Sequence, residues 1–578
     1  MKAVCFRAGL GFALLVAVVG VSRSAPDPDA EFRRQQEREA QLRRQNTLQP
    51  EARIPTTVDA AANRRLPTSE TPCFRIDKIT WRVMAAADSS APGNPFSWAT
   101  AAVNYTGEGE PDTAIGRCLG ANGINLIMKR VQNAIVSKGY VTTRVLAEPQ
   151  DLHTGELILT VIPGRIRQVR FETPSPRASA SNAIPGRINR LLNLRDIEQG
   201  LENFKRVPGV AADIRVYPSA ALGANPGDSD LVIAWEQASP VRFSLSADNA
   251  GSEDTGNYQG GLTVSYDNPL GLNDLFYLSL NNDLGRGPSA PGGARGRTMH
   301  YSAPHGYWLL GLTVSQSQYH QTVVGALETY RYSGDSENAE IKLSHLLYRD
   351  AERKTQWHLA GWARASENHI DDTEVAVQRR RMGGWTFGVN HKEYAERTTL
   401  ELGATYRRGT GAFGALPAPE ESFGEGTARP RIMELETLLK TPFMLWGQQW
   451  DYQNALRAQW HRTPLTPQDR FAIGSRYTVR GFDGENTLAG DRGWFIRNDV
   501  SMRLGRSTHA VYLGADYGSV DGPSSAGLIG KHLGGAALGV RGRVRGLRYD
   551  VSLAASLKKP EGFLSDNQVV NFNLNWML

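Results

Sequence analysis

Long apolar runs are nearly absent from this 578-residue chain, whose mean hydropathy is −0.39. One run, from Leu10 to Val21, follows Lys2 and Arg7 and stops at the small-residue pattern Ser22–Ser24. This arrangement predicts a secretory signal peptide over residues 1–24, too short for a membrane anchor. No later stretch reaches the roughly 18 apolar residues of a transmembrane helix, so the sequence excludes a protein that crosses membranes by helices.

Cysteine is also scarce, with 3 in the whole chain. Cys5 is lost with the signal peptide, which leaves Cys73 and Cys118 in an oxidising compartment. An even pair there predicts one disulfide, and two free buried thiols are the alternative.

Neither sign of charge dominates, because 65 lysines and arginines face 59 aspartates and glutamates, which gives a net charge of +6. So small an imbalance indicates a solvated surface and not a nucleic-acid footprint, and no nucleic-acid partner is expected. The 11 histidines show no HExxH or paired ligand spacing. Neither a metal nor a cofactor is therefore predicted.

Catalytic motifs are missing as well. Residues Gly409–Gly414 fit the GxGxxG pattern, but Ala415–Pro419 follow with two prolines where a dinucleotide site needs a helix. The segment Gly285–Gly296 is rich in glycine and arginine, yet it lacks the lysine and hydroxyl residue that end a phosphate-binding loop, and an extracellular loop explains it better. The sequence therefore predicts no enzyme.

Glycine and aromatic residues, by contrast, are plentiful: 59 Gly, 12 Trp, 19 Tyr and 18 Phe. A large, polar chain of this composition fits a secreted multidomain protein or an outer-membrane β-barrel. The order of its segments distinguishes the two.

Residues 25–72 combine a polar helix with a linker. From Glu31 to Asn46, strong helix formers and mixed charges carry almost no apolar stripe, only Phe32 and Leu42. A helix that is polar on every side is no core element, so this segment is either a disordered tail or a helix in a wet, polar cavity. Prolines from Pro50 onward then predict a linker.

A first small α/β module is predicted at 73–164. A strand-like start at Phe74–Ile79 precedes a helix whose apolar residues, Ile124 to Ile135, recur at helical spacing and whose stop signal is Lys138-Gly139. Strands are expected after it at Tyr140–Leu146 and Glu156–Ile162.

A second module at 165–238 repeats this plan. Leu194, Ile197, Leu201 and Phe204 give a helix an apolar face, and Asn193 is placed to cap it. Strands are expected at Ile166–Phe171, Ile214–Tyr217 and Leu231–Trp235.

From residue 239 to 578 the pattern changes to an alternation of apolar and polar side chains with period two. It begins at Val241, Phe243 and Leu245 and recurs near the end of the chain. A soluble sandwich would show the same pattern. The remaining length favours a barrel, because about 340 residues accommodate about 16 transmembrane strands of roughly 9 to 11 residues plus turns.

The last strand supports a barrel in lipid. Val570, Phe572, Leu574, Trp576 and Leu578 share one face, and three asparagines share the other. This is the pattern expected of a lipid-facing strand that closes a barrel, and closure leaves no unpaired edge in the bilayer. The predicted fold class is a membrane β-barrel of about 16 antiparallel strands, preceded by two periplasmic α/β domains.

The most informative motif lies within this barrel and consists of Val479, Arg480, Gly481, Phe482, Asp483, Gly484 and Glu485. With it, the chain resembles the outer-membrane transporter of two-partner secretion, the family that exports haemolysins, filamentous haemagglutinins and contact-dependent-inhibition exoproteins. Further matching motifs are Gly116–Gly120, Gly139–Val145, Leu192–Asp196, Asp267–Asp274, Phe471–Gly474, Arg492–Trp494 and Leu513–Gly518.

The resemblance implies an N-terminal plug helix, two polypeptide-transport-associated (POTRA) domains and a 16-stranded barrel. Their expected bounds are 25–72 for the plug helix and linker, 73–164 and 165–238 for the POTRA domains, and 239–578 for the barrel. A long sixth extracellular loop, around 471–492, folds back into the lumen. One departure from the family is the final Leu578, where such barrels usually end in phenylalanine.

The same resemblance places Arg480 at the tip of the loop and pairs it with Asp516 of the following strand. The alternation of that strand agrees, because Leu513 points one way and Gly514 and Asp516 point the other. Gly514 and Gly518 leave room for a guanidinium, which pairs bidentately with a carboxylate. The alternative is that both charges are merely solvated in the lumen.

The expected function is protein export across the outer membrane of a Gram-negative bacterium. A barrel without an ATP site moves a protein only by binding it unfolded, through strand edges and grooves of the POTRA domains, and letting it fold outside. The expected partners are an exoprotein with an N-terminal secretion domain, outer-membrane lipid and the barrel-assembly machinery. Competing classes are a barrel-assembly factor, which would carry more periplasmic domains, an autotransporter, which needs a passenger, and a porin, which needs no such domains.

Overall fold

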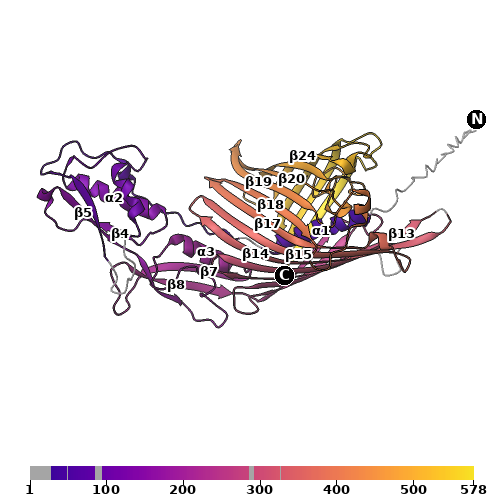
Figure 1. The fold of residues 1–578 in the computed structure, drawn as a ribbon, viewed down its shortest axis with the longest axis horizontal. Helices are drawn as coiled ribbons and strands as arrows, with labels where there is room; N and C mark the ends of the chain where they lie inside the picture. The colour runs from indigo at the N-terminus through magenta and orange to yellow at the C-terminus, as the bar shows by residue number, and fades with distance from the viewer. Residues whose placement is uncertain (1–27, 48–49, 85–93, 286–291, 326) are drawn as a thin grey trace, which may run out of the picture.

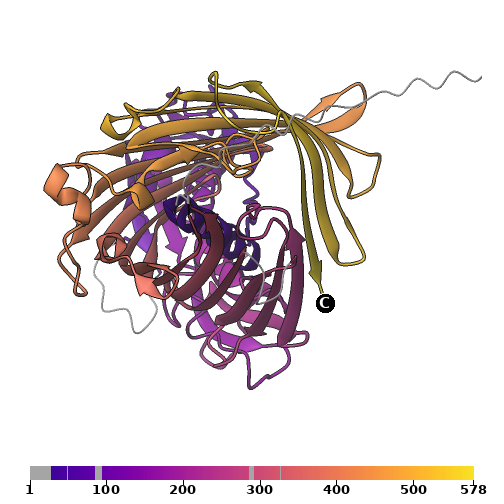
Figure 2. The same ribbon diagram turned by 90° about the vertical axis from the view of Figure 1, so that its right-hand side faces the viewer.

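The structure is a computed structural model, and it describes residues 28–47, 50–84, 94–285, 292–325 and 327–578. The predicted signal peptide and residues 286–291 of the predicted extracellular loop lie outside these ranges. The molecule is elongated, with two small α/β domains at one end and a large barrel at the other (Figure 1). The view along the barrel shows the helix α1 inside it (Figure 2).

The first α/β domain is built on a three-stranded sheet in the order β2-β5-β4. The helix α2 covers it because its apolar residues recur at helical spacing, and Ile127, Val131 and Ile135 are buried against Leu157 and Leu159 of the central strand. A second small sheet joins β1 and β3. The elements are β1 (Phe74–Arg75), β2 (Lys78–Val83), β3 (Cys118–Leu119), α2 (Ala121–Ser137), β4 (Arg144–Leu146) and β5 (Glu156–Ile162).

One predicted strand of this domain is too long. The sequence predicts strand from Tyr140, but β4 begins at Arg144. Gly139 ends the helix with φ +96°, and the residues after it form a turn whose Thr143 carbonyl accepts a hydrogen bond from Gln132 Nε2 at 2.8 Å. The helix side chain therefore stabilises a turn that residue alternation alone does not reveal.

The second domain repeats the plan with a sheet in the order β6-β8-β7. Asn193 caps the helix α3 as expected, because its Oδ1 accepts from the backbone N of Arg195 at 2.8 Å. The apolar face of α3 packs against Leu231 and Ile233 of the central strand. The elements are β6 (Arg165–Phe171), α3 (Leu194–Lys205), β7 (Val210–Pro218) and β8 (Asp228–Gln237), so the last two strands exceed their predicted bounds.

The remaining chain forms a closed antiparallel barrel of 16 main strands, in which the last strand pairs with the first. A two-residue strand, β16 (Thr373–Glu374), adds only a short extension to β15. The main strands are β9 (Val241–Asp248), β10 (Gln259–Asp267), β11 (Leu275–Asp283), β12 (Gly292–His305), β13 (Trp308–Val324), β14 (Thr329–Arg349), β15 (Arg353–Ile370), β17 (Arg380–Ala395), β18 (Thr398–Thr410), β19 (Arg431–Leu445), β20 (Gln448–His461), β23 (Arg492–Arg503), β24 (Ala510–Asp521), β25 (His532–Val544), β26 (Leu547–Lys558) and β27 (Gln568–Met577).

Side-chain alternation follows the predicted faces. On β24, Leu513 is 61% exposed on the outside, whereas Asp516 is 5% exposed towards the lumen. On β27, Val570 is exposed and Asn571 is buried. The strands β13, β14 and β15 have 17, 21 and 18 residues, which exceeds the roughly 9 to 11 that span a bilayer. These strands are therefore long enough to extend beyond the membrane, and in Figure 1 the end of β13 projects to the right of most of the other strands.

The polar helix α1 (Pro28–Asn46) lies in the lumen of the barrel, so the cavity alternative holds and the tail alternative does not. Its arginines reach the surrounding elements: Arg33 Nη1 donates to the Pro467 carbonyl at 2.8 Å, and Arg43 pairs with Glu340 of β14 at 2.9 Å. Of the helices in the described ranges, none is long and apolar enough to cross a membrane.

Candidate functional site

The loop between β20 and β23 folds back into the lumen. Its two short strands, β21 (Phe471–Ile473) and β22 (Leu488–Gly490), pair with each other and present the predicted motif between them. Apolar side chains of the loop are buried together with apolar side chains of the barrel wall, and this core holds the loop inside. Its members are Phe471, Ile473, Val479, Phe482, Leu488, Phe495, Val520, Leu533 and Phe563.

Arg480 is fixed at the tip of this loop by the predicted partner. Its Nε and Nη2 donate to the two carboxylate oxygens of Asp516 at 2.6 and 2.7 Å, and its backbone N donates to Asp516 Oδ2 at 3.0 Å. The Asp516 side chain has no exposed surface. Bidentate pairing of this kind fixes the direction of the guanidinium as well as its position.

Arg480 has a second carboxylate partner that the sequence did not predict. Arg480 Nη2 also donates to Asp499 Oδ1 at 2.7 Å, and Asp499 lies opposite Gly514 in the register of β23 and β24. Arg497 lies 4.0 Å from Asp516, and Arg541 lies 3.7 Å from Asp499. The period-two pattern of β23 places Asp499 and Arg497 on one face, so the same alternation that located Asp516 was a usable signal. We call Arg480, Asp499 and Asp516 the lumen lock.

Glycines shape the wall around the lock. A Cβ on Gly514 would lie 2.4 Å from Arg480 Nη2, so the predicted space beside the guanidinium is present. Gly518 serves a different residue, because its Cβ would lie 2.9 Å from Val479 Cγ2; its predicted role beside the arginine is wrong. Within the loop, Gly481 has φ +98° and passes so close to the wall that a Cβ would lie 2.3 Å from the Ala555 carbonyl oxygen.

The rest of the motif connects the loop to its neighbours. Phe482 is buried edge-to-face against Phe563 with ring centroids 5.8 Å apart, and Asp483 accepts from the backbone N of Asp566 at 2.8 Å. The Gly484 carbonyl accepts from Arg34 of α1 at 3.1 Å. Glu485 accepts from the backbone N of Glu253, in the turn after β9, at 2.9 Å. The motif therefore contacts the wall, the plug helix and a neighbouring turn together.

A second ion pair at the base of the loop was not predicted. Asp469 is fully buried, and Arg364 of β15 donates to both of its oxygens at 3.2 Å. Arg407 of β18 lies 3.4 Å from the same carboxylate, and the ring of Phe32 in α1 lies 5.1 Å from the Arg364 guanidinium. No local motif marks these residues, since they lie on separate strands and on the helix.

Cys73 and Cys118 form a disulfide with Cα atoms 5.2 Å apart. It joins the segment before β1 to β3 in the first α/β domain. Of the two alternatives, the structure has the disulfide. In the described residues, no group of three or more His, Cys, Asp or Glu side chains is arranged to hold a metal ion.

Three protein-family sequence profiles match the chain. The pattern for haemolysin secretion/activation proteins of the ShlB/FhaC/HecB type matches residues 227–542. Patterns for POTRA domains match residues 111–164, in the ShlB-type form, and residues 165–218. The first of these begins well after the predicted bound at 73, which leaves β1 and β2 before it.

Individual relatives match over 80% or more of the chain. Outer membrane transporter CdiB-2 of Burkholderia pseudomallei (strain 1026b) is 34% identical over 587 residues, covering 97% of each chain. Outer membrane transporter CdiB of Dickeya dadantii (strain 3937) is 28% identical and covers 80% of this chain and 81% of its own. The solved structure of CdiB from Acinetobacter baumannii superposes with a TM-score of 0.82 at 28% identity, covering 96% of this chain and 100% of that one.

Proposed function

Because this chain belongs to the haemolysin secretion/activation family of the ShlB/FhaC/HecB type, we propose that it binds an unfolded exoprotein through its POTRA domains and exports it through its barrel without ATP. It is an outer-membrane protein with periplasmic N-terminal domains, and its relatives are transporters of two-partner secretion. The exoprotein is of the haemagglutinin, haemolysin or contact-dependent-inhibition type and carries an N-terminal secretion domain.

The lumen lock is the observation that carries this proposal. The inward loop and α1 both occupy the lumen, and Arg480 holds the loop against the wall through Asp516 and Asp499. A permanently filled pore would not need a polar helix, because apolar packing would fill it more firmly. Hydrogen bonds and ion pairs, in contrast, can be exchanged for water when an exoprotein enters. The lock therefore has the chemistry of a gate that opens and closes again.

The POTRA sheets offer a means of holding an unfolded chain. Among the described residues, β2 and β4 are the outer strands of the first sheet, and β6 and β7 are those of the second. An extended polypeptide adds to such an edge through main-chain hydrogen bonds that tolerate many sequences. Folding of the exported segments outside the cell then makes transit irreversible in the absence of a nucleotide.

Deletion of residues 73–237 tests the proposal. We expect an assembled barrel, identified by its heat-modifiable migration in gels, that no longer exports its exoprotein. Conductance for small solutes should persist in planar bilayers, because the barrel itself is unchanged. Normal export by the truncated protein would remove the POTRA domains from the mechanism.

A further inference from the structure

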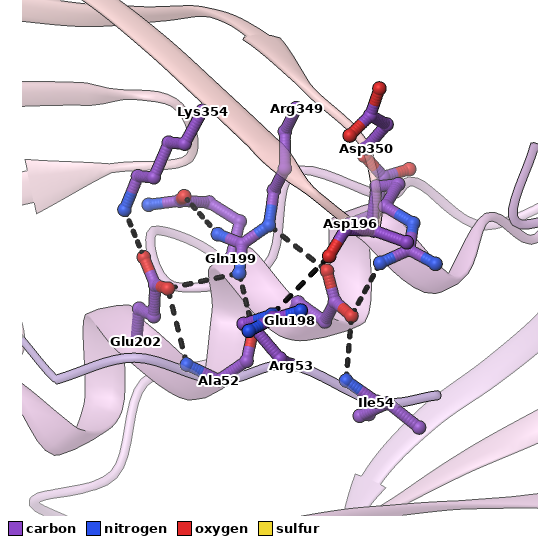
Figure 3. A network of polar contacts seen from close by, with 12 residues as sticks. Ala52, Arg53, Ile54, Asp196, Glu198, Gln199, Glu202, Arg349, Asp350 and Lys354 are labelled. Atoms are coloured by element: carbon purple, nitrogen blue, oxygen red, sulfur yellow. Dashed lines mark hydrogen bonds and ion pairs between the residues drawn. The ribbon is translucent and has the colours of Figure 1, made fainter. Parts of the chain in front are cut away.

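The linker between the plug helix and the first POTRA domain is bound by the second POTRA domain (Figure 3). The backbone N of Ala52 donates to Glu202 at 3.2 Å, and the backbone N of Ile54 donates to Glu198 at 2.8 Å. Ala52 is 8% exposed and belongs to the apolar core of that domain, against which Ile54 also packs. A segment more than 140 residues away in sequence thus completes the surface of α3.

The residues that alternate with Ala52 and Ile54 along the linker, Glu51 and Arg53, face the barrel. Arg53 donates to the Ala351 carbonyl at 3.2 Å and lies over the ring of Tyr394 at 4.2 Å, and Glu51 pairs with Lys392. Contacts that alternate from one residue to the next are those of an extended chain. The surface formed by Glu198, Glu202, Arg349 and Lys354, which we call the α3 groove, therefore binds extended backbone.

The carboxylates of the α3 groove are held in place without the linker. Glu198 accepts from Arg195 at 2.6 Å and from Arg349 at 3.0 Å. Glu202 accepts from Arg349 at 2.9 Å and from Lys354 at 2.5 Å. Since these cations are in place already, departure of the linker would leave both carboxylates in position to accept hydrogen bonds from another backbone. The site is prepared for a second extended chain.

Occupation of the groove limits the reach of the plug helix. Six residue steps separate Asn46, the last residue of α1, from Ala52. A fully extended chain of that length spans about 20 Å. The next anchored residue is Asp59, whose backbone N donates to Asn133 at 3.0 Å, thirteen steps from Asn46. Release of the linker therefore extends the reach to about 45 Å.

We infer that the α3 groove is a peptide-binding site which the linker occupies at rest, and that an extended segment of the exoprotein displaces the linker and thereby frees the plug helix. The segment needs two free backbone N–H groups two residues apart, a small side chain at the first position and an aliphatic side chain at the second. This assignment deepens the proposed function and depends on it for the identity of the partner. Arrival of the exoprotein at the POTRA domains then leads directly to clearance of the lumen.

A labelled peptide with the sequence of residues 50–57 tests the groove itself. Its binding to the full-length protein in detergent would be measured by fluorescence anisotropy. The variant Ile54→Asp, whose linker is repelled by Glu198, should bind the peptide at least tenfold more tightly than the parent protein. Adding Glu198→Gln and Glu202→Gln should abolish this gain, whereas Glu236→Gln, an exposed glutamate of the same domain, should not change it.

Backbone methylation of the peptide gives a test that is independent of protein folding. Methyl groups on the nitrogens of the residues equivalent to Ala52 and Ile54 remove the donors that the groove accepts. Binding should fall at least tenfold, while methylation at the residue equivalent to Arg53 should have a smaller effect. Equal binding of all three peptides, or equal binding to the parent protein and Ile54→Asp, would overturn the inference.

The exoprotein is tested separately. It is identified as the secreted protein that disappears from the culture fluid when this chain is deleted, and its N-terminal fragment then competes with the labelled peptide. Displacement of the peptide supports the inference. Binding of the fragment without displacement refutes the competition and leaves export intact. If no secreted protein depends on the chain, the proposed function fails, and with it the identity of the displacing partner.

Discussion

Two buried clusters of arginine and carboxylate groups, the lumen lock and the α3 groove, use the same chemistry to different effect. Arg480 and Arg349 are similarly buried, at 5% and 6% side-chain exposure. The lock places one close cation between two carboxylates, with Arg497 and Arg541 farther away. In the groove, two carboxylates are shared among three close cations, Arg349 and Lys354 of the groove and the neighbouring Arg195.

The difference lies in redundancy. Loss of Arg480 leaves two wall carboxylates without a close partner, whereas loss of Lys354 leaves Glu202 still paired with Arg349. Removing the partner of a buried charge is strongly destabilising because the remaining charge stays desolvated. The lock is therefore suited to all-or-none opening, and the groove to exchanging one bound chain for another.

The largest effect is expected from Arg480→Ala. It should destabilise the inward position of the loop by roughly 3 to 5 kcal/mol, or by less where water enters the cavity. The loop should therefore leave the wall, and export should fall sharply. Export is measured as exoprotein in the culture fluid, and barrel integrity by heat-modifiable migration. Arg492→Ala is the control. It removes an arginine at the start of β23 from an exposed ion pair with Asp521 and should leave export unchanged.

Double substitutions test whether the three residues of the lumen lock act as one unit. Arg480→Ala and Asp516→Ala should be non-additive, because each breaks the same contact. Asp499→Ala should also be non-additive with Arg480→Ala, but its single effect should be smaller. Asp499 accepts from one side-chain nitrogen of Arg480, whereas Asp516 accepts from two and from the backbone N. Full export by both Arg480→Ala and Asp516→Ala, or strictly additive losses, would show that these residues form no lock.

The disulfide is a third kind of anchor, which cannot reopen in an oxidising compartment. Replacing Cys73 and Cys118 by serine should lower the free energy of unfolding of the first POTRA domain by up to about 4 kcal/mol, because a loop of 45 residues is no longer closed. Thermal unfolding of that domain measures the loss. In the parent protein, thiol alkylation under denaturing conditions should label neither cysteine until a reductant is added.

Weaker effects are expected at the α3 groove. Arg349→Ala should weaken binding of the linker to the α3 groove by about 1 to 3 kcal/mol. The reason is that this arginine binds both glutamates and the Ala52 carbonyl. Lys354→Ala should weaken linker binding less, because Arg349 still pairs with Glu202. Trypsin cleavage after Arg53 reports release of the linker and should increase in that order. Equal cleavage in both variants would contradict the unequal sharing of the carboxylates.

The smallest effect is a pH dependence of the junction between the second POTRA domain and the barrel. Burial alone would raise the pKa of Glu202, but Lys354 and Arg349 lower it overall, so its contribution to stability is present above the ordinary carboxyl range and is lost on acidification. Burial raises the pKa of Asp196 despite its hydrogen bond from Tyr307, so its contribution has the opposite sign and is lost as the pH rises.

These two opposing groups make a sharp comparison possible. Asp196→Asn removes the group that gains stability in acid, so this variant should loosen more than the parent protein between pH 7 and pH 4.5. Spin-label distances between the second POTRA domain and the barrel, measured on samples frozen at each pH, report the loosening. An identical response of both proteins would show that Asp196 does not contribute to the pH dependence of the junction.

Features that depend only on neighbouring residues were predictable from the amino-acid sequence. The period-two pattern together with the length of its segment and the last strand predicted a barrel of about 16 strands. The same alternation predicted the lumen-facing side of Asp516, and Asn193 marked the start of α3. These features are local because a strand or a helix repeats within a few residues. The family resemblance added the partner of Arg480, which alternation alone does not supply.

Contacts between segments that are distant in the sequence, in contrast, exist only in the folded molecule. Arg364 and Asp469 are 105 residues apart, and Glu198 and Arg349 are 151 residues apart. Neither pair belongs to a repeating pattern. In the sequence, each charged residue looks like an ordinary residue of a solvated surface. The burial that turns them into anchors arises only when the barrel closes around the loop and the helix, and when the second POTRA domain packs against the turn between β14 and β15.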